Sequence, residues 1–230
     1  MSISGPRPVV RPRLYEQVAQ QIVDWIAEAG LRAGDRLPAE REFAQDLGVS
    51  RATLGQALVA LEVVGVVAVR HGDGTVITGG SASRRIVDAI RAHADRMPEV
   101  IEAREALEEK LAALAAERRT DEDLVRIDEA LAAMKADIDD GGRGVDGDEM
   151  FHAAVTRAAS SPLLAKMMEE LGALIRETRI ESLSQPGRPS ESLRAHRRIA
   201  DAIRDGDPAA AAIAMHAHIE KVSDVEVLHR

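Results

Sequence analysis

The residues best suited to chemistry in this sequence are an aspartate and three histidines in its C-terminal half. Asp148 and His152 stand four positions apart, which places them on one face of a helix. His196 and His218 each recur at helical spacing with aliphatic residues, so they also lie on faces that point into a core. One shared ion would satisfy all four polar groups, each of which is costly to bury alone. The pattern therefore predicts a metal site formed by Asp148, His152, His196 and His218.

The ligand types limit which metal this site would take. Imidazole and carboxylate ligands suit Zn²⁺, Mn²⁺, Ni²⁺ and Fe²⁺, and the absence of cysteine excludes thiolate ligands and disulfides. We expect one divalent metal ion per subunit, Zn²⁺ before Mn²⁺, Ni²⁺ or Fe²⁺. The alternative to a metal ligand, for each of the three histidines taken alone, is a buried histidine that forms a hydrogen bond with another residue of the core. His216 lies on a different face from His218 and is expected in solvent, and His71, His93 and His229 show no inward-facing pattern.

A second pattern, in residues 37–77, predicts two short helices joined by a tight turn. Pro38 suits the first position of a helix, and Gly48 suits the left-handed conformation that ends it. Ser50 is the expected N-cap of the next helix, which Gly65 ends. These two helices are expected to pack on each other through their apolar faces.

The residues that follow predict a β-hairpin. The runs 66–69 and 75–77 are short strand candidates, joined by a turn at Gly72-Asp73-Gly74. This order of elements is that of a winged helix-turn-helix, which places the start of its second helix against base edges in the DNA major groove. The exposed residues at that start are Arg51, Ala52, Thr53 and Gln56. The alternative is a small helical subdomain that binds nothing.

The net charge of −9 argues against a nucleic-acid-binding protein, but its distribution does not. Residues 1–80 contribute −1 and residues 81–230 contribute −8. A near-neutral head can bind DNA if its arginines gather on one face, and such binding weakens steeply with salt. The arginines concerned are Arg7, Arg11, Arg13, Arg41, Arg51 and Arg70. Those before Leu14 could equally form a disordered tail, which we assign to residues 1–9.

The elements that must position the four metal-ligand candidates lie beyond a flexible linker at residues 79–83. Strand signals vanish there, and helix patterns alternate with helix stops. The expected helices span about residues 84–97, 98–118, 121–139, 146–159, 161–184, 190–205 and 208–225. We therefore expect a mainly α protein, in which a three-helix winged head with a β-hairpin precedes an all-α antiparallel bundle of six or seven helices. Aromatic residues make up only 2 % of the chain, so aliphatic side chains and methionine must form the core.

Residues 10–78 resemble the winged helix-turn-helix domain of the GntR family of bacterial transcription regulators, of the FadR type. The run Leu37-Pro38-Ala39-Glu40-Arg41 followed by Val49-Ser50-Arg51 carries the resemblance. It implies that Arg41, Arg51 and Thr53 contact phosphates and bases, and that the wing residues His71 and Gly72 enter the minor groove. The family usually has a second arginine where this chain has Gly55. Arginine is the commonest reader of guanine, so a different operator sequence is expected.

Residues 84–225 resemble the FCD domain, the effector-binding helical domain of these regulators. Its metal-binding members carry an Asp-x₃-His pair and one histidine on each of the last two long helices, as this chain does at Asp148, His152, His196 and His218. The resemblance implies that a small organic acid binds beside the metal. Ser161 and Ala195 stand where asparagine and glutamate are frequent, so the shape of the effector pocket is expected to differ.

An arginine often holds the acid in such domains, within the pattern E-x-R-x-x-L-E. Residues 102–108 match this pattern, which makes Arg104 the first candidate for the carboxylate clamp. The alternative for Arg104 is an exposed ion pair with Glu108, four residues on. Arg176 and Arg179, on the helix after Pro162, are weaker candidates.

These expectations describe a homodimeric transcription regulator, a repressor that releases a palindromic double-stranded operator when a small carboxylate binds. No signal-peptide-like stretch and no run of about 20 apolar residues is present, so we expect a cytoplasmic protein with no membrane partner. Two alternatives remain. In the first, the metal ion itself is the signal. In the second, the metal activates water and the protein is a hydrolase.

Overall fold

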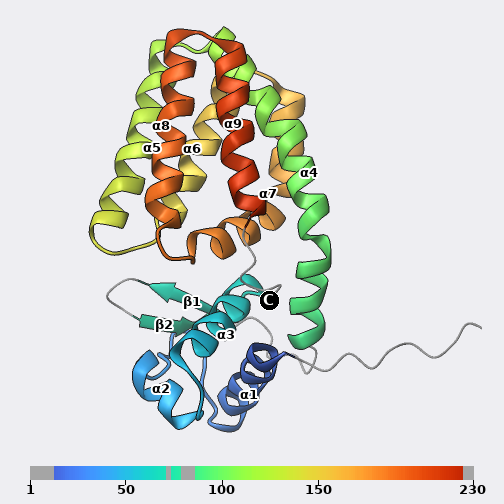
Figure 1. The fold of residues 1–230 in the computed structure, drawn as a ribbon, viewed down its shortest axis with the longest axis vertical. Helices are drawn as coiled ribbons and strands as arrows, with labels where there is room; N and C mark the ends of the chain where they lie inside the picture. Colours follow the sequence, from blue (N-terminus) through green and yellow to red (C-terminus); the bar gives the residue numbers. More distant parts are fainter. Residues whose placement is uncertain (1–12, 71–73, 79–85, 225–230) are drawn as a thin grey trace, which may run out of the picture.

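Two separate hydrophobic cores divide the protein into an N-terminal head and a helical bundle (Figure 1). The structure is a computed structural model that describes residues 13–70, 74–78 and 86–224. We refer to the described residues up to 78 as the head and to residues 86–224 as the bundle. The expected fold class, a mainly α protein with a winged head and an antiparallel bundle, is confirmed.

The head contains α1 (Leu14–Glu28), α2 (Glu40–Asp46) and α3 (Arg51–Val63), followed by β1 (Val67–Arg70) and β2 (Gly74–Ile77). The two strands pair antiparallel, from Val67 opposite Ile77 to Arg70 opposite Gly74.

The local signals around α3 act as expected. The Ser50 hydroxyl accepts the backbone N–H of Thr53 at 3.0 Å and caps the helix. Gly48 and Gly65 have φ angles of 67° and 73°, the left-handed conformation that other residues rarely adopt. The turn before α3 and the stop after it are therefore set by these two glycines.

The expected start of α2 at Pro38 was wrong, because the helix begins at Glu40 with Ala39 as its N-cap. The backbone N–H of Leu37 donates to the carbonyl of Thr75 at 2.9 Å, and Arg36 forms a bridge with Val76. The chain thus contacts the hairpin up to Leu37, and the helix begins two residues later than the proline signal indicated.

Several expectations lie outside the described residues. These are the tail at residues 1–9 with Arg7, the nearby Arg11, the hairpin turn with His71 and Gly72, and the linker at residues 79–83. His229 also lies outside them.

The bundle begins with α4 (Ile86–Arg118), a single helix of 33 residues. The expected break between residues 97 and 98 was wrong, because Pro98 lies inside this helix. Proline removes one backbone hydrogen bond and usually kinks a helix. Here Pro98 is exposed, while Met97, Val100 and Ile101 beside it are buried, so packing on both sides of the proline maintains the helix.

Helix α4 also connects the two cores. Its Ile90 is buried in the core of the head, whereas its Leu111 belongs to the core of the bundle. A helix of this length spans about 50 Å, and Figure 1 shows it running from beside α1 along the side of the bundle.

The remaining helices agree with the sequence prediction to within two residues. They are α5 (Asp121–Asp139), α6 (Val145–Ala158), α7 (Pro162–Leu183), α8 (Arg188–Asp205) and α9 (Pro208–Ser223). Thr120 caps α5 as expected, and its hydroxyl accepts the N–H of Asp123 at 3.2 Å. Within the residues that the structure describes, no helix combines the length and apolarity that crossing a bilayer requires.

Helices α5 and α6 pack unusually closely at Gly147. A Cβ atom added there would lie 2.4 Å from the Cα of Met134, so only glycine fits at this position. The next residue is Asp148, one of the metal-ligand candidates. The close contact therefore fixes the backbone that carries Asp148.

A polar joint connects the head to the bundle, and we define it as Glu62, Arg143 and Ser184. One guanidinium nitrogen of Arg143 donates to both carboxylate oxygens of Glu62 at 2.7 Å, and the other donates to the Ser184 hydroxyl at 2.6 Å. Glu62 lies near the end of α3 and also accepts the N–H of Val69 in β1 at 3.0 Å. Arg143 lies two residues before the start of α6, and Ser184 directly follows α7. The joint thus ties the head to the start of α6 and the end of α7.

Candidate metal centre

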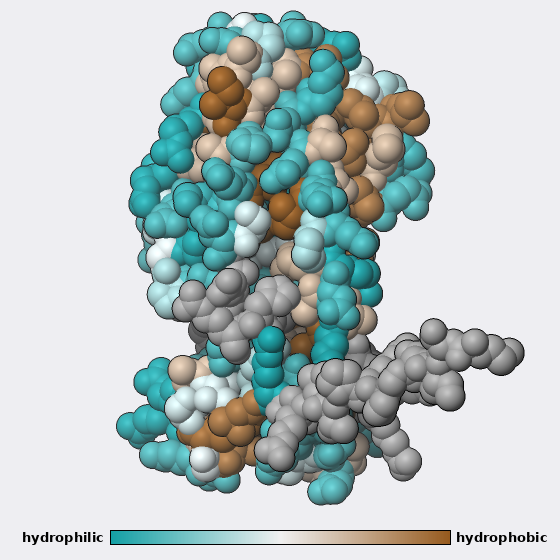
Figure 2. Space-filling view, turned by 45° about the vertical axis from the view of Figure 1, so that its right-hand side comes forward, coloured by the Kyte–Doolittle hydropathy of each residue, from teal (hydrophilic) through white to brown (hydrophobic). Residues whose placement is uncertain are grey.

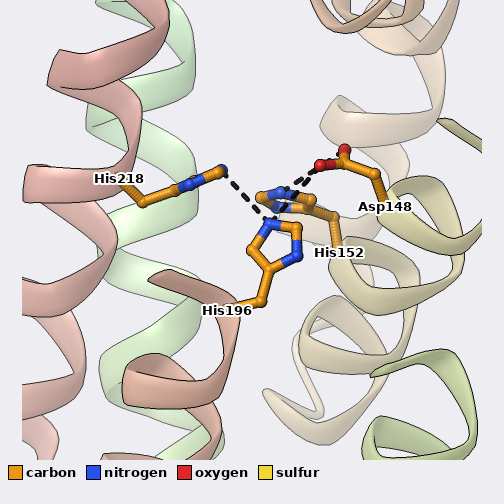
Figure 3. Close-up of side chains that lie close together, drawn as sticks. All are labelled: Asp148, His152, His196 and His218. Atoms are coloured by element: carbon orange, nitrogen blue, oxygen red, sulfur yellow. Dashed lines mark hydrogen bonds and ion pairs between the residues drawn. The ribbon is translucent and has the colours of Figure 1, made fainter. Parts of the chain in front are cut away.

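Four buried side chains from three helices converge inside the bundle (Figure 3). Asp148 and His152 come from α6, His196 from α8 and His218 from α9. Each residue is at most 3 % exposed. One ligand atom from each residue can be chosen so that all four atoms lie within 4.8 Å of one another. The four residues singled out in the sequence are therefore brought together by the fold.

The imidazole Nε2 atoms point toward a common space. The Nε2 of His196 lies 3.3 Å from the Nε2 of His218 and 3.5 Å from Oδ1 of Asp148. The Nε2 of His152 lies 3.8 Å from Oδ2 of Asp148. No described residue, Asp148 included, forms a hydrogen bond with this buried Nε2. A buried nitrogen without a hydrogen-bond partner is costly in a protein core, and an ion at this position would satisfy it.

The charge states suit metal binding. Burial lowers the pKa of His196 to about 3, and burial likewise holds the pKa of His218 well below its usual value. Both imidazoles are therefore neutral near pH 7 and keep a lone pair for a metal. Burial alone would raise the pKa of Asp148, but His196, His152 and Arg179 nearby outweigh it and lower the pKa. The cluster thus offers the neutral imidazoles of His196 and His218 and the carboxylate of Asp148.

A buried ion pair supports His152 from behind. Oε2 of Glu108 lies 2.5 Å from Nδ1 of His152. The other oxygen, Oε1, accepts Nε of Arg104 at 2.6 Å, and Arg104 also donates to the Thr178 hydroxyl at 3.0 Å. A carboxylate beside Nδ1 favours the tautomer with the proton on Nδ1 and leaves Nε2 free to bind a metal. Burial alone would raise the pKa of Glu108, but Arg104 and His152 hold it well below its usual range.

Arg104 therefore pairs with Glu108, as the alternative interpretation had it, but the pair is buried rather than exposed. Arg104 is 0 % exposed and Glu108 is 2 % exposed. The i,i+4 spacing indicated the pair, whereas the burial depends on α7, which covers it through Thr178.

A cavity of about 460 Å³ lies against this centre, between α6 and α7. It is lined by Glu149, His152, Ala153, Thr156, Arg157, Ala165, Met168, Glu169, Gly172, Ile175 and Arg179. His152 belongs both to the cluster and to the cavity wall. Any molecule in the cavity would therefore lie beside a bound ion.

Two arginines line this cavity, and Arg179 is the buried one, whereas Arg157 is exposed. The Nε of Arg179 lies 2.8 Å from Oδ2 of Asp148, and its side chain is 10 % exposed. Arg104 does not line the cavity, and Arg176 lies at the surface, where it pairs with Asp146 and Glu149. The helical spacing of Arg179 with Gly172 and Ile175, in the same wall, is the sequence signal that could have ranked it first.

The DNA-binding candidates are located on the surface of the head. Arg41, Arg51, Ala52 and Arg70 are exposed, and Thr53 is half-buried. Ala52 and Gln56 line a second cavity, of about 620 Å³, between α3 and the bundle, with Arg143, Ser184 and Gln185 on its other side. One face of α3 therefore lies toward the joint rather than toward open solvent.

Sequence reasoning missed one buried histidine, His93. Its Nδ1 lies 3.0 Å from Glu177 and its Nε2 lies 2.8 Å from Glu181, both on α7. Burial alone would lower the pKa of His93, but the two carboxylates outweigh it and raise the pKa to about 9. Ile90 and Met97, at helical spacing from His93, are buried on the same face of α4, and this pattern could have identified it. His216, by contrast, is exposed as expected.

Comparison with known proteins is consistent with this architecture. Residues 14–77 match the model for bacterial regulatory proteins of the gntR family, and residues 99–221 match the FCD domain. The chain is 32 % identical over 216 residues to the uncharacterized HTH-type transcriptional regulator YcbG of Bacillus subtilis, covering 94 % of this chain and 91 % of YcbG. It is 33 % identical over 208 residues to the HTH-type transcriptional regulator LutR of the same organism, covering 87 % and 95 %.

The solved structure of Streptococcus agalactiae GntR is 28 % identical and covers 91 % of this chain and 99 % of that one, with a TM-score of 0.49. The domain matches and the relatives are transcriptional regulators rather than enzymes. The chain therefore belongs to the GntR family of bacterial regulatory proteins, and it combines a DNA-binding helix-turn-helix head with an FCD domain.

Proposed function

We propose that this regulator is a repressor whose affinity for its operator is set by a small carboxylate bound beside a divalent metal ion. The observation that carries the proposal is the convergence of the three imidazoles and Asp148 at the wall of a cavity that also contains Arg179. A carboxylate entering this cavity would meet a metal ion and a nearly buried guanidinium together.

Asp148, His152, His196 and His218 would hold the ion, and this ligand set suits Zn²⁺ first, with Mn²⁺, Ni²⁺ or Fe²⁺ as alternatives. Once bound, the ion supplies positive charge that attracts an anion. Arg179 is the carboxylate clamp in this proposal, since it faces the cavity. Arg104 acts through Glu108 and His152, and Arg176 remains at the surface.

The joint supports a route from the cavity to the head. Helices α6 and α7 form the cavity walls, and Arg143 and Ser184 sit at the start of α6 and the end of α7. Arg143 donates hydrogen bonds to the Ser184 hydroxyl and to the carboxylate of Glu62 on α3. A ligand that changes the spacing of α6 and α7 would therefore change how α3 is held. An effector shifts such an equilibrium only through its different affinities for the two states.

In this proposal the protein is a homodimer, and the head of each subunit binds one half-site of a palindromic operator. Arg51 and Thr53 at the start of α3 would face bases, and Arg41 and Arg70 would contact phosphates. Leu163 and Met167, four residues apart on α7, are 73 % and 46 % exposed and supply apolar surface for subunit contact. Figure 2 shows hydrophobic residues at several places on the bundle surface, including its right-hand edge, among mostly hydrophilic ones.

The proposal is tested with the metal-loaded full-length protein and an operator selected from random DNA. Small carboxylates are screened by thermal shift, and DNA affinity is measured by fluorescence anisotropy with and without each hit. We expect a binding acid to weaken DNA affinity by a factor of about 5 to 150, the usual range of such coupling. R179A should abolish the effect of the acid, whereas R176A, on the same helix, should retain it.

Two outcomes would overturn the proposal. If no carboxylate changes DNA affinity but a chelator alone releases the operator, the ion itself is the signal, and the four protein ligands make that reading possible. If R51A binds the operator with unchanged affinity, α3 is not the reading helix.

A further inference from the structure

The wall of the cavity between α6 and α7 is apolar over most of its surface. Its uncharged lining residues are Ala153, Thr156, Ala165, Met168, Gly172 and Ile175. Among the described lining residues, Thr156 is the only one of these with a side-chain hydrogen-bonding group. The inner end is different, because His152 and the guanidinium of Arg179 lie there beside Asp148.

The other charged residues of the lining already have partners. Glu149 pairs with Arg176, Glu169 accepts Lys166 at 2.9 Å, and Arg157 lies 3.8 Å from Asp123. The side chains of Arg157 and Glu169 are 63 % and 72 % exposed, so they belong to the rim of the cavity. A ligand rich in hydroxyl groups would leave water and find few partners here, which is unfavourable.

The cavity wall contains a glycine, Gly172, that its local structure does not require. It lies inside α7, where glycine is less favourable than alanine. Its φ is not in the left-handed region, and a Cβ atom added at Gly172 would meet no atom within 4 Å. Neither backbone conformation nor crowding requires glycine at this position. The absent side chain leaves space in the cavity wall instead.

The size of the cavity agrees with this reading. A volume of about 460 Å³ lies in the usual range for small-molecule sites, about 300 to 1,000 Å³. A carboxylate bound at Arg179 would leave most of that volume to the rest of the molecule.

We infer that the ligand of this cavity is an amphiphilic monocarboxylate, with its carboxylate at the Arg179 end and an aliphatic or aromatic body along Ala165, Met168 and Gly172. The inference rests on the proposed function, because the carboxylate end relies on the same arginine and ion. It adds that polyhydroxylated acids of similar length are rejected.

The test measures dissociation constants by calorimetry on the metal-loaded full-length protein. The probes are butanoate, hexanoate and octanoate, with gluconate as the hydroxylated acid and 1-hexanol as the apolar molecule without a carboxylate. We expect Kd to fall about fourfold for each added methylene until the cavity is filled. Gluconate and 1-hexanol should each bind at least about tenfold more weakly than hexanoate.

A pair of variants checks the location. G172L should weaken hexanoate binding at least about tenfold while the metal content stays unchanged, because leucine would occupy the cavity. A173L, at the next and exposed position of α7, should leave hexanoate binding as it is. Unchanged hexanoate binding in G172L would overturn the inference.

The outcomes separate this inference from the proposed function. Gluconate binding as tightly as hexanoate overturns the apolar body and leaves the carboxylate proposal standing. Binding of 1-hexanol as tight as that of hexanoate removes the role of the carboxylate, and with it the proposed function. Absence of binding by every acid removes both.

Discussion

The bundle buries histidines in two different environments, and the contrast explains what each can do. His93 lies between Glu177 and Glu181, whose carboxylates raise its pKa to about 9, so it is a cation near pH 7. His196 and His218 lie beside each other, His196 also lies beside Asp148, and burial keeps both imidazoles neutral. Two carboxylates for one imidazole complete an ion pair within the protein. One carboxylate among three imidazoles leaves lone pairs directed at a common space, which is what a metal ion requires.

Removing one imidazole from each environment should break the contrast most clearly. H196A should lose the metal, and with it the stabilisation that a ligand bound only to the native state provides. That stabilisation is about 4 kcal/mol when the free ion is 1,000-fold above its Kd. Metal content by mass spectrometry and melting temperature with and without chelator measure both effects. H93A should still bind the metal and respond to chelator, and an H196A protein with unchanged metal content would contradict the site.

The charged state of His93 predicts a pH dependence of the free energy of unfolding. A pKa raised from about 6.5 to about 9 means that the folded state binds the proton more tightly. The stabilisation is complete below pH 6.5 and is lost as the pH rises through about 9, and its full size is on the order of 3 kcal/mol. Denaturation at pH 6.5, 8 and 9.5, with chelator present, should show this loss. H93Q should be nearly independent of pH over that window.

A matched variant keeps this measurement specific. His216 pairs with Glu109 on the surface, so H216Q should retain the pH dependence of the wild type. If H93Q and the wild type lose stability equally between pH 6.5 and 9, the ion pair of His93 with α7 does not form in solution.

The smallest expected effect tests the carboxylate behind His152. E108Q keeps the size of the side chain and one acceptor oxygen, but it replaces the second oxygen with an amide donor and removes the negative charge that faces Arg104 and Nδ1 of His152. Such outer partners typically contribute a factor of about 10 to 100 in metal affinity, and we expect the lower end for this conservative change. Competition with a chromophoric chelator measures it. E109Q changes the neighbouring residue, which faces the surface, and should have no effect.

The local features could be predicted from the sequence, because they depend on residues that are close together in the chain. The caps at Ser50 and Thr120, the glycine stops and the inward faces of His196 and His218 are of this kind. The four candidate ligands could be grouped because each lies on an apolar helix face. Features that depend on distant partners were missed. His93 meets carboxylates 84 and 88 residues away, and the burial of Arg104 depends on Thr178.

Two other differences have the same origin. The continuity of α4 through Pro98 depends on the helices that pack beside it, which outweigh the local preference of proline. Arg179 and Arg176 are three residues apart on α7, and only the position of α6 decides that Arg179 faces the cavity while Arg176 faces solvent.

Because α4 is unbroken, the number of residues in this helix sets the orientation of the head relative to the bundle. Each residue inserted between Ile90 and Leu111 would rotate the head relative to the bundle by about 100° and shift it by about 1.5 Å. Hybrid regulators made by exchanging heads would therefore work only when the exchange preserves the number of residues in this helix. An insertion of seven residues nearly restores the rotation. It would still move the head away from the bundle along α4 and would therefore separate Glu62 from Arg143.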